Sequence, residues 1–354
     1  MKEYKNKPPA LWLYWGAIGI FIQIVLGGIT RLTGSGLSIT EWKPLLGILP
    51  PLNTADWEKS FDAYKQIAQF KVVNAHFTIA DYKSIFFWEW LHRNWARFLS
   101  ILFIIPCIVL YIKGYIHKAM HFPLGILFLL GVLQGAIGWI MVKSGLNDTA
   151  IAVNDIKLAI HFITAIVLLC YTLWMAFKLS APYVYIPFPL KIRNTSAILL
   201  LLILLQLFYG ALMAGSKAAL SAPTWPDMNG YFIPPTLYGG DSVAAYPLIV
   251  QFVHRLIAIM IAVLIIIFYT QSSRWKYNVK LNLLRKFSVL LILIQIALGV
   301  YTLLNSFATS YAMYAILHQF IGLLLCCTML FIFYLAQRAS ESKSCADSNR
   351  ETSF

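Results

Sequence analysis

The sequence predicts an all-α integral membrane protein in which eight transmembrane helices form two pseudo-two-fold-related four-helix bundles. Three observations support this prediction. Of the 354 residues, 60% are hydrophobic and 12% are charged, which is too apolar for a soluble globular protein. Eight apolar runs approach the length of about 20 residues that crosses a bilayer as a helix. Four histidines recur at matching places in these runs, which indicates an internal repeat.

The expected helices lie, in chain order, near residues 11–29, 91–112, 122–142, 158–178, 196–215, 248–269, 287–305 and 313–335. The segment 30–88 is long and rich in aromatic residues, so we expect an ordered outer loop with short helices rather than a flexible linker. Residues 179–194 are expected to form a cytoplasmic linker between two halves, 1–178 and 195–337. The polar tail, 338–354, is expected to be disordered.

A helical hairpin is repeated four times along the chain. Each odd-numbered helix carries a Gln-x-x-x-Gly pair: Gln23/Gly27, Gln134/Gly138, Gln206/Gly210 and Gln295/Gly299. Each even-numbered helix carries one histidine near its outer end: His92, His161, His254 and His318. Such glycines let membrane helices approach closely, or leave room for a flat macrocycle. Because each half has an even number of spans, the repeat must be parallel, with its axis along the membrane normal.

The net charge of +14 indicates topology rather than nucleic-acid binding. If the N-terminus is cytoplasmic, the cytoplasmic segments contain 16 Lys and Arg residues against 4 Asp and Glu residues. Basic residues accumulate on the cytoplasmic side of membrane proteins. We therefore expect cytoplasmic termini, a membrane-lipid surrounding and no nucleic-acid partner. The N-terminus resembles neither a signal peptide nor a presequence, so we expect a multi-pass protein of a bacterial inner (plasma) membrane.

The four repeated histidines are candidate axial ligands of haem iron. A single histidine in a membrane helix is more often explained by an interhelical hydrogen bond, but four in equivalent hairpins favour a shared function. Facing imidazoles in a helical bundle are a common haem site. The expected ligand pairs are His92 with His161 and His254 with His318.

Several arginines are candidates for binding haem propionates. Arg93 and Arg255 each directly follow a candidate ligand, and a guanidinium group matches a carboxylate in shape and charge. Arg31 and Arg97 lie at the same level. For these two, simple snorkelling of the side chain to the membrane interface is an equal alternative.

Glu89 is the candidate catalytic residue. It lies three residues before His92, so the two side chains share one face of a helix. The equivalent position in the second half is Gln251, which suggests that only the first half performs chemistry. A carboxyl group beside a haem would accept a proton or stabilise a developing cation. The alternative is a charge on the protein surface at the membrane interface.

These motifs resemble the haem A synthase family. The resemblance rests on Gly27–Ser38 (GGITRLTGSGLS), Trp42-Lys43-Pro44, Pro50-Pro51, Glu89–Arg93 (EWLHR) and the three later histidines. It covers all eight helices and is greatest to the branch shared by Gram-negative bacteria and mitochondria, because the first outer loop has no cysteine pair. It implies an oxidoreductase that oxidises the C8 methyl group of haem O to the formyl group of haem A, for cytochrome oxidase biogenesis.

The resemblance also implies a role for each half. The N-terminal half would bind the substrate haem between His92 and His161, with Glu89 beside the reacting methyl group. The C-terminal half would bind haem b as a cofactor between His254 and His318. Haem O is then the substrate, and a haem O synthase, cytochrome oxidase assembly factors and a second copy of this chain are candidate partners.

Two alternatives remain open at this point. A dihaem b-type electron-transfer protein, such as a quinol-linked cytochrome, would use the same four histidines but would not need Glu89 to differ from Gln251. A transporter is the weaker alternative, because its spans should be broken near the midplane. The expected spans are mostly unbroken, and Pro106 is the main interior exception.

Overall fold

A computed structural model describes residues 2–41, 46–147, 149–180, 190–237 and 242–351. Within these ranges the chain forms helices joined by loops, without a β-strand. Eight of the helices are long and apolar enough to cross a membrane. The predicted all-α membrane fold with eight spans is therefore confirmed. Trp42-Lys43-Pro44 and much of the predicted 179–194 linker lie outside the described residues.

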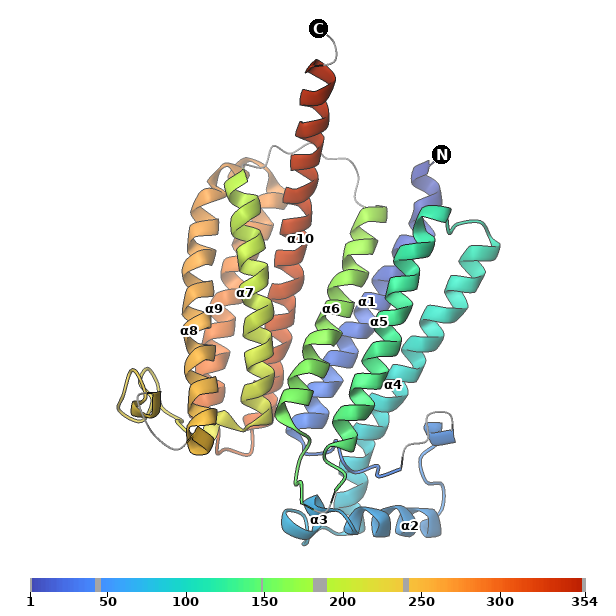
Figure 1. Ribbon diagram of the computed structural model, residues 1–354, viewed down its shortest axis with the longest axis vertical. Coiled ribbons are helices and arrows are strands. Elements are labelled where there is room, and N and C mark those ends of the chain that lie inside the picture. The colour runs from blue at the N-terminus through green and yellow to red at the C-terminus, as the bar shows by residue number, and fades with distance from the viewer. Residues whose placement is uncertain (1, 42–45, 148, 181–189, 238–241, 352–354) are drawn as a thin grey trace. The chain divides into compact units, whose positions relative to one another are not determined.

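The spanning helices are α1 (Lys2–Leu32), α4 (Ile79–Ile112), α5 (Lys118–Lys143), α6 (Asp155–Ser180), α7 (Leu190–Gly215), α8 (Ser242–Gln271), α9 (Val279–Leu304) and α10 (Tyr311–Glu351) (Figure 1). The shorter elements are η1 (Leu46–Ile48), α2 (Thr54–Lys65), α3 (Ala68–Val72), η2 (Ala218–Leu220), η3 (Pro235–Leu237) and η4 (Ser273–Tyr277). Most spans are longer than the apolar runs that predict them, because helical hydrogen bonding continues into the polar flanks.

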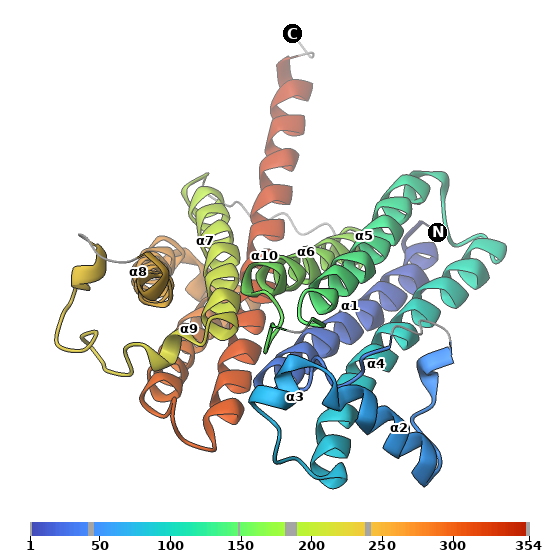
Figure 2. The same ribbon diagram turned by 60° about the horizontal axis from the view of Figure 1, so that its bottom comes forward.

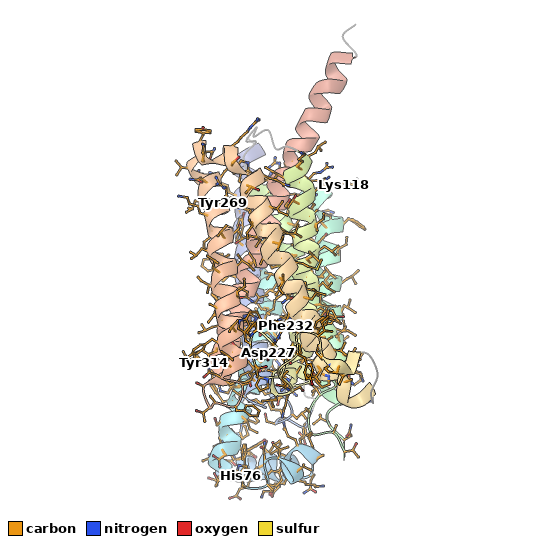
Figure 3. The ribbon with its side chains drawn as sticks, turned by 90° about the vertical axis from the view of Figure 1, so that its left-hand side faces the viewer. His76, Lys118, Asp227, Phe232, Tyr269 and Tyr314 are labelled. Carbon is orange, nitrogen blue, oxygen red and sulfur yellow. The ribbon has the colours of Figure 1, made fainter. Side chains whose placement is uncertain are left out.

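The chain divides into two compact units, and each contains one predicted histidine pair. The His92 unit comprises residues 14–169 and 211–218, and the His254 unit comprises residues 1–13, 170–210 and 219–354. Most of α1, α4, α5 and α6 run side by side in the first unit, and α7, α8, α9 and α10 do so in the second (Figures 1 and 2). Within the His254 unit, Asp227, Phe232 and Tyr314 lie towards one end and Tyr269 towards the other (Figure 3).

Helix α4 begins at Ile79, well before the predicted start near residue 91. Its N-terminus is a capping box, in which the Thr78 N–H donates to Asp81 Oδ2 (2.8 Å) and the Asp81 N–H donates to Thr78 Oγ1 (3.4 Å). Charged and aromatic residues in the first turns hide this extension from a search for apolar runs. The predicted loop 30–88 is therefore too long, and Glu89 lies inside a helix rather than at its start.

The loop between α1 and α4 packs on the first turns of α4 through an aromatic cluster. Tyr82 of α4 stacks on Phe61 and Tyr64 of α2, with ring centres 5.0 and 5.3 Å apart. The Tyr82 hydroxyl lies 3.2 Å from Ser38 O, to which it donates a hydrogen bond. Tyr64 and Tyr82 are fully buried, so this loop has a small core of its own. The predicted ordered loop with short helices is confirmed, and Figure 2 shows α2 and α3 beside the start of α4.

Large apolar side chains are exposed along the outward faces of the spanning helices. On α4 they include Phe98, Ile101, Ile105 and Ile108. Their spacing of three or four residues places them on one helical face. An apolar stripe of this kind is unfavourable in water, whereas in a bilayer it contacts lipid tails. The distribution of exposed residues therefore agrees with a lipid environment.

Helix α10 continues to Glu351, through a stretch whose polar composition predicts disorder. An existing helix gains one hydrogen bond for each residue that it adds, so extension is easier than initiation. The stretch also contains Ala, Glu, Lys and Arg, which are good helix formers.

Candidate functional site

Each predicted histidine faces a neighbouring helix that carries a Gln-x-x-x-Gly pair. In all four cases the glutamine amide nitrogen lies 3.1–3.3 Å from a ring nitrogen. The contacts are Gln23 Nε2–His92 Nε2 (3.3 Å), Gln134 Nε2–His161 Nδ1 (3.1 Å), Gln206 Nε2–His254 Nε2 (3.1 Å) and Gln295 Nε2–His318 Nε2 (3.3 Å). The repeat pattern identifies both motifs, but it does not reveal that they contact each other.

The glycine of each pair makes room for the histidine ring. A Cβ atom added at Gly27, Gly138 or Gly299 would lie 3.1, 2.8 or 2.9 Å from Cε1 of the facing histidine, and one at Gly210 would lie 3.5 Å away. Except at Gly210, these separations are shorter than an ordinary carbon–carbon contact. Glutamine and glycine are four residues apart and share a helical face. The space that these glycines open is therefore filled by the imidazole edge.

The His254–His318 pair has the ring spacing expected of two histidines that bind one metal ion. Their ring centres are 6.4 Å apart, with 63° between the ring planes. Two imidazoles that each bind one metal at about 2 Å would have ring centres roughly 6 Å apart. His318 Nδ1 lies 3.1 Å from Gln295 O, an arrangement that orients a ligand histidine and leaves Nε2 to bind. These residues fit a haem with two axial histidines.

The His92–His161 pair offers the same donor set for such a group. Each ring has a glutamine amide nitrogen beside it, at 3.3 and 3.1 Å. His92 Nδ1 is buried, with no hydrogen-bond partner in the described part of the chain. Gln23 Nε2 and Gln134 Nε2 each also donate to the backbone oxygen of the facing histidine, at 3.1 and 3.0 Å. With Gln23 donating to Nε2, Nδ1 carries the ring proton, and the described residues give this buried N–H no acceptor.

Glu89 is 2% exposed, so the alternative of a surface charge is wrong. Its Oε1 accepts from Arg93 Nη2 at 2.6 Å, and its Oε2 accepts from Ser38 Oγ at 2.7 Å and from the Ile39 N–H at 2.8 Å. Arg93 Nη2 also donates to Ile39 O at 3.0 Å. Glu89 and Arg93 thus fasten the segment after α1 onto α4. Sequence reasoning missed Ser38 and Ile39, although Ser38 ends the motif that carries the resemblance.

The equivalent position in the other unit is built differently. Gln251 is fully buried, and its Nε2 donates to Ala222 O at 2.8 Å. Arg255 donates to the backbone oxygens of Thr224 and Asp227, both at 2.8 Å. An amide therefore holds a loop carbonyl here, whereas the carboxyl group of Glu89 holds a loop N–H and a hydroxyl. The acid and the amide differ in the loop that each holds as well as in charge.

The loop that Arg255 holds is itself ordered around Asp227. The Asp227 carboxylate accepts hydrogen bonds from the Gly230 N–H at 3.0 Å and from Thr224 Oγ1 at 2.7 Å. These two bonds, and then the Arg255 charge, hold the pKa of Asp227 below its usual value. Both predicted propionate ligands, Arg93 and Arg255, are thus engaged with loop backbone, beside their histidines on α4 and α8.

The other two arginines have separate partners. Arg31 Nη2 donates to Ala214 O at 2.6 Å and to Gly215 O at 3.0 Å, the last carbonyl groups of α7. Arg97 Nη1 donates to Asn94 Oδ1 at 2.8 Å on its own helix. Arg31 therefore caps a helix C-terminus, which is a more specific role than snorkelling to the interface.

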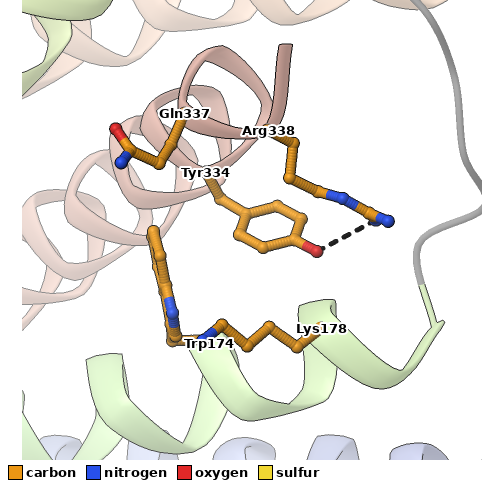
Figure 4. Close-up of a pocket in the computed structure, with 5 residues that line it drawn as sticks. All are labelled: Trp174, Lys178, Tyr334, Gln337 and Arg338. Carbon is orange, nitrogen blue, oxygen red and sulfur yellow. Dashed lines mark hydrogen bonds between the residues drawn. The ribbon is translucent and has the colours of Figure 1, made fainter. Parts of the chain in front are cut away.

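A small cavity lies apart from the four histidines, between α6 and α10 of the His254 unit. Its volume is about 240 Å³, and it is lined by Trp174, Lys178, Tyr334, Gln337 and Arg338 (Figure 4). The Tyr334 hydroxyl donates to Phe177 O and accepts from Arg338 Nη1, both at 3.1 Å. None of the predicted site residues lines it.

Comparison with known proteins places the chain among cytochrome oxidase assembly proteins. The model of that family matches residues 10–330. A heme A synthase of Methylorubrum populi is 39% identical over 300 residues, which cover 83% of this chain and 78% of the relative. One of Flavobacterium psychrophilum is 40% identical over 314 residues, covering 85% and 91%. One of Brucella anthropi is 37% identical over 319 residues, covering 88% and 87%.

Proposed function

The chain belongs to the cytochrome oxidase assembly protein family, and we propose that it is a haem A synthase, which oxidises the C8 methyl group of haem O to the formyl group of haem A. The relatives that carry this name match most of the chain at 37–40% identity. That similarity, over all eight spans, is the observation on which the proposal rests. The family resemblance seen in the sequence motifs is confirmed.

The two histidine pairs suggest a division of labour. In this proposal the half 1–178 binds the substrate haem through His92 and His161, and the half 195–337 binds a resident haem b through His254 and His318. The ring separation of 6.4 Å in the second pair supports one metal between two imidazoles. When bound, the iron porphyrins supply the redox chemistry.

The protein's part in the reaction is to hold the substrate and to place one carboxyl group near it. Glu89 lies one helical turn before His92, and it is buried and kept in place by three donors. Oxidation of a methyl group removes protons and leaves electron-poor carbon. A fixed carboxyl group can accept a proton or stabilise positive charge at that point. Arg93 and Arg255 lie next to the ligands, and a propionate would bind them alongside the loop contacts that they already make.

Chromatography of the haems extracted from the purified protein tests this function. A synthase should yield haem O or haem A together with haem b. Haem b alone would favour the dihaem electron-transfer cytochrome, which uses the same four histidines. A preparation that shows no haem absorbance would contradict both.

The proposed location is the inner membrane of a bacterium, with both termini in the cytoplasm. The excess of basic residues in the cytoplasmic segments supports this orientation. A haem O synthase, cytochrome oxidase assembly factors and a second copy of the chain are the partners that this activity would bring to the protein.

An Ala75→Cys variant should react with a membrane-impermeant thiol reagent added to the outside of intact cells. Ala75 is exposed on the loop between α3 and α4. Ser60, in the same outer loop, is less suitable for labelling because its hydroxyl is hydrogen-bonded to Tyr82 at 2.6 Å. Because the chain has cysteines of its own, the unmodified protein is the control. Labelling that occurs only when the reagent can reach the cytoplasmic face of the membrane would show the opposite topology.

A further inference from the structure

We propose that the glutamines of the Gln-x-x-x-Gly pairs compete with haem iron for the histidine lone pairs, and thereby set how readily each haem exchanges. The inference rests on the proposed function, because it requires the histidines to be haem ligands. It follows from the direction of the hydrogen bonds between each glutamine and its histidine.

Backbone carbonyl groups determine the orientation of two glutamine amides. Gln23 Nε2 is 3.1 Å from His92 O, and Gln134 Nε2 is 3.0 Å from His161 O. A carbonyl oxygen can only accept, so the amide atom that faces it is the nitrogen and not the oxygen. The same nitrogen reaches the histidine ring. Each ring nitrogen that faces a glutamine must therefore be the acceptor.

At His318, the hydrogen bond made by the other ring nitrogen leads to the same assignment of donor and acceptor. Its Nδ1 lies 3.1 Å from Gln295 O, so Nδ1 must carry the proton and donate. In a neutral imidazole the other nitrogen, Nε2, then holds the lone pair. The amide atom of Gln295 that lies 3.3 Å from Nε2 must be an N–H donor. Gln206 Nε2 likewise lies 3.1 Å from His254 Nε2.

The glutamine and the iron therefore require the same electrons. A neutral imidazole has only one nitrogen lone pair in its ring plane, and that lone pair cannot accept an N–H and bind a metal at once. For iron to bind, the amide nitrogen must move away. When iron leaves, the amide can satisfy the buried nitrogen that would otherwise lack a partner.

The amides differ in how firmly they are held. The side-chain oxygens of Gln23, Gln206 and Gln295 are buried and without hydrogen-bond partners in the described structure. Gln134 differs, because its Oε1 accepts from Thr164 Oγ1 at 2.7 Å. The donor to His161 is thus the one anchored at both ends.

This difference matches the needs of the two haems. The substrate haem of a synthase must be released after every turnover, whereas a resident haem must stay. An anchored amide at His161 would compete most strongly with iron, on the substrate side. The other three glutamine amides, which lack a hydrogen bond at their oxygen within the described residues, can move away from the histidine more easily. His161 is therefore the ligand whose bond to iron should break first.

The test is the rate at which haem b leaves the purified protein for an excess of a haem-scavenging protein. In Gln295→Leu the competing donor is gone and the side chain keeps a similar volume. A freed Nε2 would then be buried without a partner. Haem b should therefore leave about tenfold more slowly than from the wild type, the factor that corresponds to one unsatisfied buried nitrogen.

Two controls separate competition from packing. Gln271→Leu removes a glutamine whose Oε1 accepts from Thr195 Oγ1 at 2.8 Å, at the far end of α8 from His254, and should leave the rate unchanged. Iron-free protoporphyrin IX, followed by its fluorescence, should bind the wild type and Gln295→Leu equally, because no metal then competes. Gln206→Leu is the second variant and should also slow the loss of haem b.

Faster loss of haem b from both leucine variants would overturn the inference, since the glutamines would then support the ligands. Tighter binding of the iron-free porphyrin to Gln295→Leu would also overturn it, because packing would explain the slower loss. If the purified wild-type protein contained no haem, that result would contradict both the proposed function and this inference. Haem b present but lost faster from the variants would leave the function intact.

Discussion

Replacing Glu89 with glutamine should lower the rate of haem A formation on the order of 100-fold or more, while haem remains bound in both halves. The substitution removes the charge and the proton acceptor and leaves His92 in place. Cells that produce the variant should accumulate haem O or a partly oxidised haem at the expense of haem A. The measurement is the ratio of haem A to haem b among the haems extracted from the purified protein. Haem b retained by the purified protein shows that it is folded.

The contacts of Glu89 require a control for structure. In the variant Arg93 loses its charged partner. The new amide NH2 group cannot accept a hydrogen bond, so at least one donor that faces Glu89 loses its acceptor, and a buried group left unpaired costs about 1–3 kcal/mol of folding free energy. Ser38→Ala removes one contact to the same carboxyl group without changing its charge. If Glu89 only fastens the loop, the two variants should lose stability and haem A output together. Normal haem A output from a stable Glu89→Gln protein would remove the catalytic role.

Replacing His318 with alanine should reduce the haem b content of the purified protein to about a tenth of the wild-type value or less, because one of two axial ligands is lost. The Gln295 N–H would also lose its acceptor. The pyridine haemochrome spectrum measures the loss, and gel filtration shows whether the protein remains dispersed. His254→Ala should have the same effect.

His121→Ala is the matched control for these variants. His121 lies near the start of α5, where its ring centre is 5.9 Å from that of Tyr111, and it belongs to none of the four hairpin motifs. Its replacement should leave the haem content unchanged. Full haem b in His318→Ala would show that the second pair is not a haem site, however well its ring separation suits one.

The sequence was sufficient to predict the class of fold because lipid imposes a simple rule on a chain. Each span must satisfy its own backbone hydrogen bonds, so apolar runs of sufficient length indicate helices. A search for apolar runs does not find the start of α4. Its first turns lie against the aromatic loop cluster around Tyr82, and the signal there is the capping box of Thr78 and Asp81 rather than hydropathy.

The candidate site was predictable as a set of residues but not as a set of contacts. Repetition identified the histidines and the Gln-x-x-x-Gly pairs separately, because each recurs at one place in every hairpin. Which ring atom meets which amide depends on side-chain rotation, which spacing does not record. His161 illustrates this, since Gln134 reaches its Nδ1 whereas the other three glutamines reach Nε2. The burial of Glu89 likewise depends on a loop distant in sequence.

The cap that Arg31 places on α7 has a consequence for the symmetry of the two repeats. Counting from the Gln-x-x-x-Gly pairs, Ala214 is the position in the second repeat that corresponds to Arg31, so Arg31 donates to the backbone of its own counterpart. Two identical copies would bring two guanidinium groups to this point, and like charges repel. An arginine in one repeat and an alanine in the other avoid that repulsion. The two repeats are therefore not interchangeable at this contact: one supplies the guanidinium group and the other supplies the carbonyl that accepts from it.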